Sequence, residues 1–160
     1  MGSVVAVCVS KTKGERKTPV SAVELLAEHG IVGDAHAGPW HRQVSLLALE
    51  SIAKMQQMGL EVTTGDFAEN ITTAGIELTQ LPIGTCLEVG QTLLEVTQIG
   101  KECHNRCAIY YQAGDCVMPK EGIFARVLRS GTVMPNDSVT VVRMTMPLVA
   151  PQTQSFQILR

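Results

Sequence analysis

The fold is decided by residues 85–98, which read TCLEVGQTLLEVTQ. Residues 85–89 and 92–98 are short runs rich in apolar and β-branched side chains, which is typical of strands. The glycine between the runs, Gly90, predicts a tight hairpin turn. The stretch therefore predicts two neighbouring strands joined by a hairpin.

The same pattern of short apolar runs separated by turn residues extends outward in both directions. Downstream, the step Pro135-Asn136-Asp137 predicts a turn with proline at its start. Many short strands at close spacing, with few helices, predict a mainly β fold (β-rich α+β) that is built as a barrel or a sandwich. In addition to the two strands of the hairpin, strands are expected at residues 4–9, 43–47, 69–73, 124–128 and 138–144.

Two segments favour short helices. Residues 48–58 carry apolar side chains at helical spacing and precede Gly59, which predicts a helix with a glycine stop. Ser21 and Glu24 have the spacing of a capping box, so residues 21–30 favour a second short helix. The apolar residues between them also suit a strand, and both interpretations stay open for this segment.

Length and composition place limits on the class of protein. A chain of 160 residues fits one domain with a sizeable core. We expect the domain at residues 1–146, followed by a C-terminal tail at residues 147–160 that can dock as an edge strand. The net charge of -2 predicts no nucleic-acid partner and no anionic membrane surface. No apolar run is long enough to span a bilayer.

The first ten residues predict a strand and not a signal peptide, because no basic leader precedes the apolar run and no clear cleavage site follows it. We therefore expect a cytoplasmic protein whose thiols stay reduced.

The chain has five cysteines, an odd number that excludes a full set of internal disulfides. Cys8 and Cys86 lie within apolar runs and are expected to be small core residues.

The most chemically loaded stretch is KECHNRCAIY, which begins at Lys101. It holds two cysteines, Cys103 and Cys107. Basic side chains lie beside them, at Lys101, His104 and Arg106. Nearby cations favour the thiolate, which is the reactive and metal-binding form of cysteine, so a lowered thiol pKa is expected.

Spacing alone leaves the chemistry of this stretch open. Structural zinc would use Cys103, Cys107, Cys116 and His104, but only one pair has zinc-knuckle spacing. A thiol nucleophile, or a dithiol that cycles through a disulfide, fits equally well. So does a single metal ligand at a cofactor site. At least one of the three cysteines can also be buried without a chemical role, and Cys116 is a candidate.

Two further polar stretches lie far from these cysteines. In residues 33–43, Asp34 can orient an imidazole and Arg42 can bind a phosphate in a bidentate manner. In residues 65–72, Asn70 can satisfy loop backbone groups or contact a ligand. The alternative roles are structural: a hydrogen-bonded His36 and a surface ion pair of Arg42. The charged run at residues 11–17 predicts a solvated loop, with an anion-binding loop as the alternative.

Taken together, these stretches resemble the MOSC domain family, the C-terminal domain of molybdenum cofactor sulfurases. The resemblance covers residues 4–142 and rests on five motifs in the family's order. They are Gly33-Asp34-x-His36-x-Gly38 with Trp40-x-Arg42-Gln43-Val44-Ser45-Leu46-Leu47, Gly65-x-Phe67-x-Glu69-Asn70-Ile71-Thr72, Leu81-Pro82-Ile83-Gly84 with Leu87-Glu88-Val89-Gly90, Cys103-x-x-x-Cys107, and Phe124-Ala125-Arg126-Val127-Leu128 with Gly131-x-Val133-x-Pro135-x-Asp137.

The resemblance implies a barrel-like fold with a few short helices, and a cytoplasmic protein of the small stand-alone bacterial type. It also implies a site at which a cysteine binds molybdenum or carries sulfur. Larger relatives tend to have Cys-x-Arg-Cys, whereas here the spacing is one residue longer. Matching the Arg-Cys step selects Cys107, and matching the first cysteine selects Cys103.

The resemblance thus predicts a domain that binds the molybdenum-pterin cofactor, or carries sulfur on a cysteine for its delivery or maturation. Cys107, or else Cys103, is the predicted catalytic residue and metal ligand. The predicted cofactor-binding residues are His36, Arg42, Gln43, Asn70, Lys101 and Arg106.

Any enzymatic activity is expected to be sulfur transfer or molybdenum-dependent, together with a partner protein. The predicted partners are the cofactor or its sulfur donor, and molybdopterin biosynthesis proteins. Pyridoxal phosphate would belong to such a partner, because the chain has no domain for it. The alternative is a non-catalytic interaction module of cofactor biosynthesis, with structural zinc or no metal.

Overall fold

The structure is a computed structural model that describes residues 1–100 and 118–143. In chain order its elements are β1 (Gly2–Val9), β2 (Thr18–Val20), β3 (Val23–Leu26), β4 (Gly30–Ile31), β5 (Val44–Ala48), α1 (Leu49–Gln57), β6 (Ile71–Ala74), η1 (Leu78–Gln80), β7 (Cys86–Val89), β8 (Thr92–Ile99), α3 (Met118–Glu121), β9 (Ile123–Arg129), β10 (Gly131–Val133) and β11 (Ser138–Arg143).

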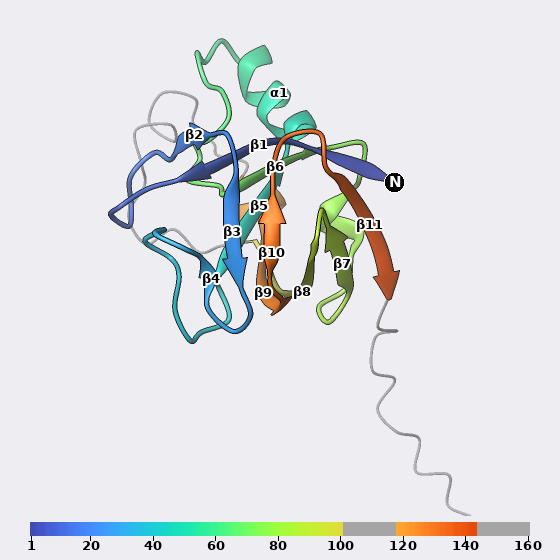
Figure 1. Cartoon of the computed structure of the whole chain (residues 1–160). Helices are drawn as coiled ribbons and strands as arrows, with labels where there is room; N and C mark the ends of the chain where they lie inside the picture. The colour runs from blue at the N-terminus through green and yellow to red at the C-terminus, as the bar shows by residue number, and fades with distance from the viewer. Residues whose placement is uncertain (101–117, 144–160) are drawn as a thin grey trace, which may run out of the picture.

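Seven of the strands close into a barrel in the order β1, β6, β5, β9, β8, β7 and β11 (Figure 1). Closure is completed by the pairing of β11 with β1, in which Gly2 lies opposite Val139. The barrel pairs are antiparallel except for β5 and β6, which α1 connects in parallel. Closing the sheet leaves no exposed edge along these strands. The predicted barrel-like, β-rich fold is confirmed.

A small sheet of β10, β3 and β4 covers one side of the barrel. Val23 and Leu25 of β3 are buried, whereas Glu24 and Leu26 are exposed, which is the period of two expected of a strand with one buried face. The helix predicted for residues 21–30 is therefore wrong, and the strand interpretation is confirmed. The capping-box spacing is overridden because a strand buries both apolar side chains against the barrel.

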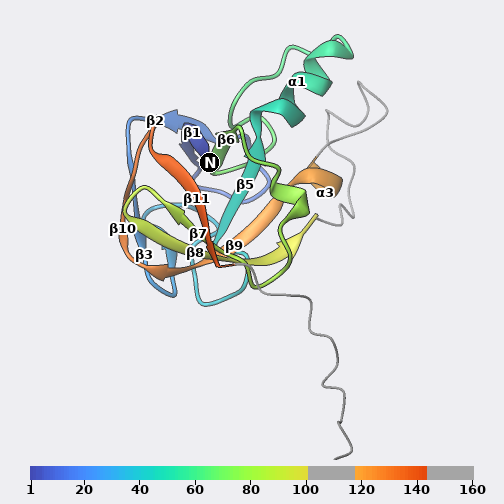
Figure 2. The same cartoon turned by 90° about the vertical axis from the view of Figure 1, so that its right-hand side faces the viewer.

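The core has two parts separated by β5. Leu46 of this strand packs into the barrel interior, while the next residue, Leu47, packs under α1 with Ile52 and Phe124. Successive side chains of a strand point to opposite faces, so a strand buried on both faces has a continuous apolar run. Helices α1 and α3 lie on the side of the barrel away from β3 and β10 (Figure 2).

Several local predictions are confirmed. The hairpin joins β7 to β8, with Val89 opposite Thr92 and Gly90 at φ +55°. The predicted helix is α1, and Gly59 follows it at φ +91°. Cys8 and Cys86 are buried. No helix within the described ranges has the length and hydropathy needed to cross a bilayer. The predicted tail at residues 147–160 lies outside the described residues.

Candidate functional site

A polar loop, residues 33–43, joins β4 to β5 at one end of the barrel, and a buried ion pair fixes its start. The Lys17 ammonium lies 2.8 Å from Oδ1 of Asp34, and both side chains are fully buried. Burial by itself raises the pKa of the Asp34 carboxyl, but hydrogen bonds from His36, Lys17 and Ser10 outweigh it and hold the pKa well below its usual range. Asp34 is therefore a permanent anion at neutral pH.

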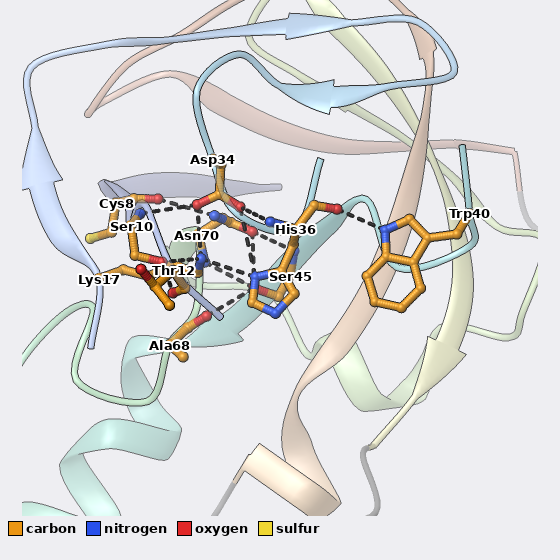
Figure 3. A network of polar contacts seen from close by, with 10 residues as sticks. All are labelled: Cys8, Ser10, Thr12, Lys17, Asp34, His36, Trp40, Ser45, Ala68 and Asn70. Carbon is orange, nitrogen blue, oxygen red and sulfur yellow. Dashed lines mark hydrogen bonds and ion pairs between the residues drawn. The ribbon is translucent and has the colours of Figure 1, made fainter. Parts of the chain in front are cut away.

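Lys17 corrects the prediction of a wholly solvated run at residues 11–17. Its neighbours from Lys11 to Arg16 are exposed, but Lys17 itself is 3% exposed. Its Nζ atom contacts three groups: Oδ1 of Asp34, Oγ of Ser10 at 2.9 Å and Nδ1 of His36 at 3.1 Å. The ammonium therefore ties the polar loop to the end of β1 (Figure 3).

His36 and Trp40 are held together by the backbone of the same loop. The backbone N–H of His36 donates to Oδ2 of Asp34 at 3.0 Å, and Nε1–H of Trp40 donates to the His36 carbonyl at 2.7 Å. The two rings are nearly parallel, with 2° between their planes and 6.4 Å between their centroids. The loop therefore presents two planar side chains in a fixed relation (Figure 3).

Two cations lie over the Trp40 ring. The Lys13 ammonium is 4.6 Å from the ring centroid and the Arg42 guanidinium carbon is 4.7 Å from it. The guanidinium also lies 5.6 Å from the Phe124 ring. The Nε atom of Arg42 is buried and has no hydrogen-bond partner among the described residues. A buried donor without a partner costs about 1–3 kcal/mol, more if charged, so this N–H is suited to an anionic acceptor from outside the chain.

Gln43 and Asn70, both predicted to bind the cofactor, are placed inside the barrel wall. Gln43 is 2% exposed, and its Oε1 accepts a hydrogen bond from the backbone N–H of Val127 at 2.9 Å. Oδ1 of Asn70 accepts from the backbone N–H of Ser45 at 3.0 Å, and its amide donates to the Cys8 carbonyl at 3.1 Å. Both side chains thus brace backbone next to the loop, and their contact with a cofactor stays a prediction.

Glu69 is a second buried carboxylate, and it lacks a cation. Its Oε1 accepts a hydrogen bond from the backbone N–H of Gly65, while its Oε2 has no partner among the described residues. Burial, together with the charge of Asp66, raises the pKa of Glu69 to about 7. Burial and the charges of Glu69 and Asp66 also raise the pKa of Cys8 to about 12, so this thiol stays protonated and is no nucleophile.

Asp34 and Glu69, the two buried carboxylates, are not joined by any hydrogen bond among the described residues. Asp34 is bound to Lys17, Ser10 and the backbone of His36, whereas Glu69 is bound to Gly65. The two carboxylates have separate partners and opposite pKa shifts.

The cysteine stretch lies outside the described residues, so Cys103, Cys107, Lys101 and Arg106 are not placed. The residues on either side of it are placed. The backbone N–H of Gly100 donates to the Gly122 carbonyl at 2.7 Å, and Ile99 lies opposite Ile123 in the β8–β9 pair. The end of β8 and the start of β9, which lie on either side of this stretch in the sequence, thus meet at one point.

That point lies beside the polar loop. The hydroxyl of Thr97 donates to the His41 carbonyl, and the His41 ring lies 2.8 Å from Oε1 of Gln98. On the other flank, the Arg42 guanidinium covers the Phe124 ring. Within residues 1–100 and 118–143, no cluster of three or more His, Cys, Asp or Glu side chains is placed to hold a metal ion.

A cavity of about 280 Å³ opens on the flank of the loop. Its walls are formed by Glu28, Pro39, Trp40, His41, Gln43 and Arg126. The edge of the Trp40 indole is therefore accessible from a recess that β9 also borders.

Comparison with known protein families supports the resemblance in the sequence. The model of the MOSC domain matches residues 33–140, more than half of the chain. The chain belongs to the MOSC domain family. The match begins at the polar loop, so it includes Asp34 and His36 but not Lys17. The buried cation of this MOSC domain is thus supplied from outside the matched span.

Solved structures show the same fold. The YuaD protein from Bacillus subtilis superposes with a TM-score of 0.71 at 18% identity, over 87% of this chain and 94% of that one. YiiM from Geobacillus stearothermophilus has a TM-score of 0.66 at 21% identity, over 89% and 76%. YiiM from Escherichia coli has a TM-score of 0.67 at 19% identity, over 92% and 72%. No curated protein matches the chain.

Reasoning from the sequence alone missed one residue of this MOSC domain and placed another in the wrong element. Lys17 stands in a charged run, and nothing in its neighbours distinguishes it from the exposed Lys11 and Lys13. Glu69 was assigned to the start of a strand, but β6 begins at Ile71 and leaves Glu69 in the preceding loop. The partner of Lys17 is decided by a close approach of distant segments, whereas the partner of Glu69 is the nearby backbone of Gly65.

Proposed function

We propose that this MOSC domain binds the molybdenum-pterin cofactor at the end of the barrel that carries the polar loop, and holds its metal or a transferable sulfur on a cysteine. The observation that carries the proposal is the meeting of two segments. Gly100 and Gly122, which lie on either side of the cysteine stretch in the sequence, are joined by a backbone hydrogen bond, and His41 bonds to Thr97 and Gln98 at the end of β8. The polar loop therefore lies next to the end of β8, which precedes the cysteine stretch in the sequence, and we expect the two motifs to meet there.

The described residues fit the anionic part of such a cofactor. The buried Nε–H of Arg42 lacks an acceptor among the described residues, and the guanidinium carbon lies over the rings of Trp40 and Phe124. A planar guanidinium with free donors is the side chain best suited to a phosphate. Lys13, over the same indole, adds a second positive charge. We expect Arg42 and Lys13 to bind the phosphate, with Lys101 and Arg106 as further sequence-based candidates.

The loop is also rigid enough to serve as a binding surface. The Lys17–Asp34 pair and the bond from Trp40 to His36 hold its start and its centre. A site works best when its side chains are locked by a supporting shell of contacts before the ligand arrives. Here the buried Lys17 ammonium supplies supporting contacts of this kind.

The cysteine role rests on chemistry and on the family. A thiolate is a soft ligand that suits a metal centre and can also carry sulfur. Bound there, the cofactor would supply a redox-active metal. Cys107 is our first choice as the ligand or sulfur carrier, with Cys103 as the second. We place the protein in the cytoplasm, where thiols stay reduced. Any sulfur transfer would need a partner that mobilises the sulfur.

Cofactor loading of the purified full chain tests the proposal. After addition of the molybdenum-pterin cofactor and gel filtration, retained molybdenum is measured for the wild type, for Cys103→Ser/Cys107→Ser and for Arg42→Met. We expect retention by the wild type and loss in both variants. The matched control is Cys86→Ser, which removes a buried thiol of β7. Equal retention by wild type and the double cysteine variant would exclude the metal-ligand role.

Mass spectrometry of freshly isolated protein separates the two cysteine roles. A sulfur adduct on Cys107 or Cys103 supports the carrier role, and a bare thiol with retained molybdenum supports the ligand role. Stoichiometric zinc in protein purified without added metal, lost on mutation of Cys116, would favour the rival interaction module instead.

A further inference from the structure

The His36 imidazole has one ring nitrogen within the buried network and one outside it. Nδ1 lies 3.1 Å from the Lys17 ammonium. Nε2 has no hydrogen-bond partner among the described residues, and the side chain keeps 16% exposure. In Figure 3 the Nδ1 side of the ring faces Lys17 and Asp34, and the opposite side is turned away from them. What Nε2 offers to a ligand depends on which nitrogen carries the proton.

The number of N–H groups on Lys17 decides which nitrogen of His36 carries the proton. A lysine ammonium has three N–H groups and no acceptor. Three atoms lie within hydrogen-bond distance of Nζ, one each from Asp34, Ser10 and His36. Oγ of Ser10 gives its own proton to the Thr12 carbonyl, so it accepts from Lys17. The Asp34 carboxylate only accepts. The third N–H therefore points at Nδ1 of His36, which must carry a lone pair.

A proton on Nδ1 of His36 would have no acceptor within hydrogen-bond distance among the described residues. A proton on Nδ1 would need Oδ2 of Asp34 as its acceptor, but that oxygen is 3.8 Å away, beyond hydrogen-bond range. The proton would also meet the Lys17 ammonium at 3.1 Å, placing two donors against each other. These distances therefore favour a proton on Nε2 over a proton on Nδ1. The hydrogen bond made by one ring nitrogen thus sets the state of the other.

We propose that Lys17 is a positioning residue that locks His36 as the neutral Nε2–H tautomer, so that His36 donates a hydrogen bond to an oxyanion bound jointly with Arg42. The Arg42 guanidinium carbon lies 4.7 Å and the His36 ring centroid 6.4 Å from the centroid of the Trp40 ring, and Nε of Arg42 has no partner among the described residues. The opposite tautomer would present a lone pair and repel an anion. The ligand class, a phosphate-like oxyanion, rests on the proposed function, whereas the tautomer rests on the described geometry alone.

Nitrogen NMR of the full chain tests the tautomer. Long-range correlation spectra of ¹⁵N-labelled protein at neutral pH resolve the two nitrogens of each imidazole, and the chain has four histidines. The signal missing in His36→Asn identifies His36. We expect an Nε2–H pattern with a lone pair on Nδ1. An Nδ1–H pattern, or a doubly protonated ring, would overturn the proposal.

The role of Lys17 is tested with a charge-neutral variant. Lys17→Met/Asp34→Asn removes both charges together, so no buried charge is left unpaired. We expect the single tautomer to become a mixture. Ser10→Ala is the matched control, because it removes another partner of Nζ but leaves the bond to His36. A retained Nε2–H tautomer in the double variant contradicts the positioning role of Lys17. If the double variant does not fold, loss of the single tautomer in Ser10→Ala contradicts that role instead.

Inorganic phosphate is the probe for the donor role. Its addition should shift the Nε2–H signal of His36 and the Nε–H signal of Arg42 together. His36→Gln retains a donor at the Nε2 position and should bind phosphate within about twofold of wild type, whereas His36→Asn ends at the Nδ1 position and should bind about tenfold more weakly.

The outcomes also separate this inference from the proposed function. A response of Arg42 without His36 overturns the donor role and leaves the anion site standing. A response of both with no retained molybdenum supports the donor role and refutes the cofactor proposal. No response from either refutes the donor role together with the anion site.

Discussion

Two buried carboxylates lie near one end of the barrel, and they differ in their binding partners and in the direction of their pKa shifts. Asp34 is paired with Lys17, and hydrogen bonds outweigh burial and lower its pKa. Glu69 has a backbone donor and the like charge of Asp66, so burial prevails and its pKa rises to about 7. Burial disfavours the charge in both cases, and the partner decides which state the fold keeps.

The difference suggests two functions for buried charge. The Lys17–Asp34 pair fixes the geometry of the polar loop and is satisfied at both ends. Glu69 leaves one oxygen without a partner among the described residues, so its state can change near neutral pH at the base of β6. The first carboxylate is a fixed anchor, and the second is a titrating group.

Breaking the anchor should have the largest effect. Lys17→Met leaves the Asp34 carboxylate buried and unpaired, which lowers the free energy of unfolding by about 3–5 kcal/mol. Lys17→Met/Asp34→Asn should recover most of the loss. Urea denaturation monitored by Trp40 fluorescence measures both. A loss below about 1 kcal/mol in the single variant would show that the pair does not anchor the fold.

Neutralising Glu69 should have the next largest effect, which grows as the pH rises from its ordinary pKa of 4.5 to its folded pKa of about 7. The folded protein holds the Glu69 proton more tightly than the unfolded chain, because its pKa is about 7 in the fold against an ordinary value of 4.5. The stability that Glu69 contributes should therefore be fully present at acid pH and be lost as the pH rises towards 7. The contribution is about 1–3 kcal/mol.

Denaturation of Glu69→Gln at pH values on both sides of the transition provides the comparison. The amide still accepts from Gly65 but carries no charge, so the variant should gain stability relative to wild type at alkaline pH. Parallel pH profiles of the two proteins would contradict the raised pKa of Glu69.

Loosening the centre of the loop should have a smaller effect. Trp40→Phe keeps a ring but removes the bond from Nε1 to the His36 carbonyl. We expect a loss of about 0.5–1.5 kcal/mol in the free energy of unfolding, the typical contribution of one hydrogen bond. The His36 tautomer should be unchanged, because Nδ1 keeps its bond to Lys17. A lost Nε2–H signal in this variant would place the control of the tautomer in Trp40 instead.

A matched surface pair should have the smallest effect. Arg16 lies 3.7 Å from Asp66 and its side chain is 56% exposed. Arg16→Met, one residue before the buried lysine, should change the free energy of unfolding by less than about 1 kcal/mol, because water screens exposed charges. Urea denaturation under the same conditions as Lys17→Met makes the comparison direct. Equal losses in the two variants would show that burial does not distinguish them.

Much of the fold was predictable from the sequence because the signals are local. The hairpin at Gly90, the helix before Gly59 and the strand at residues 4–9 each follow from residues within one element. Residues 21–30 were ambiguous, since a capping-box spacing competed with a two-residue period. The family resemblance also came from the sequence, through the order of five motifs.

The candidate site was predictable only in part. The polar loop, with Asp34, His36 and Arg42, was identified from its sequence, and the structure places all three around Trp40 or Lys17. Gln43 and Asn70 were also named, but a sequence does not reveal that their amides bond to the barrel backbone. The cysteine pair lies outside the described residues, so its role remains a prediction.

By itself, the sequence determined the strand-rich class, the family and the residue types available for chemistry, because periodicity and motif order are properties of the chain. Only the tertiary structure decided which groups meet. Lys17 and Asp34 are 17 positions apart and carry no mark that pairs them. Barrel closure excludes water around both, and that loss of solvation turns an ordinary lysine into the residue that sets the tautomer of His36.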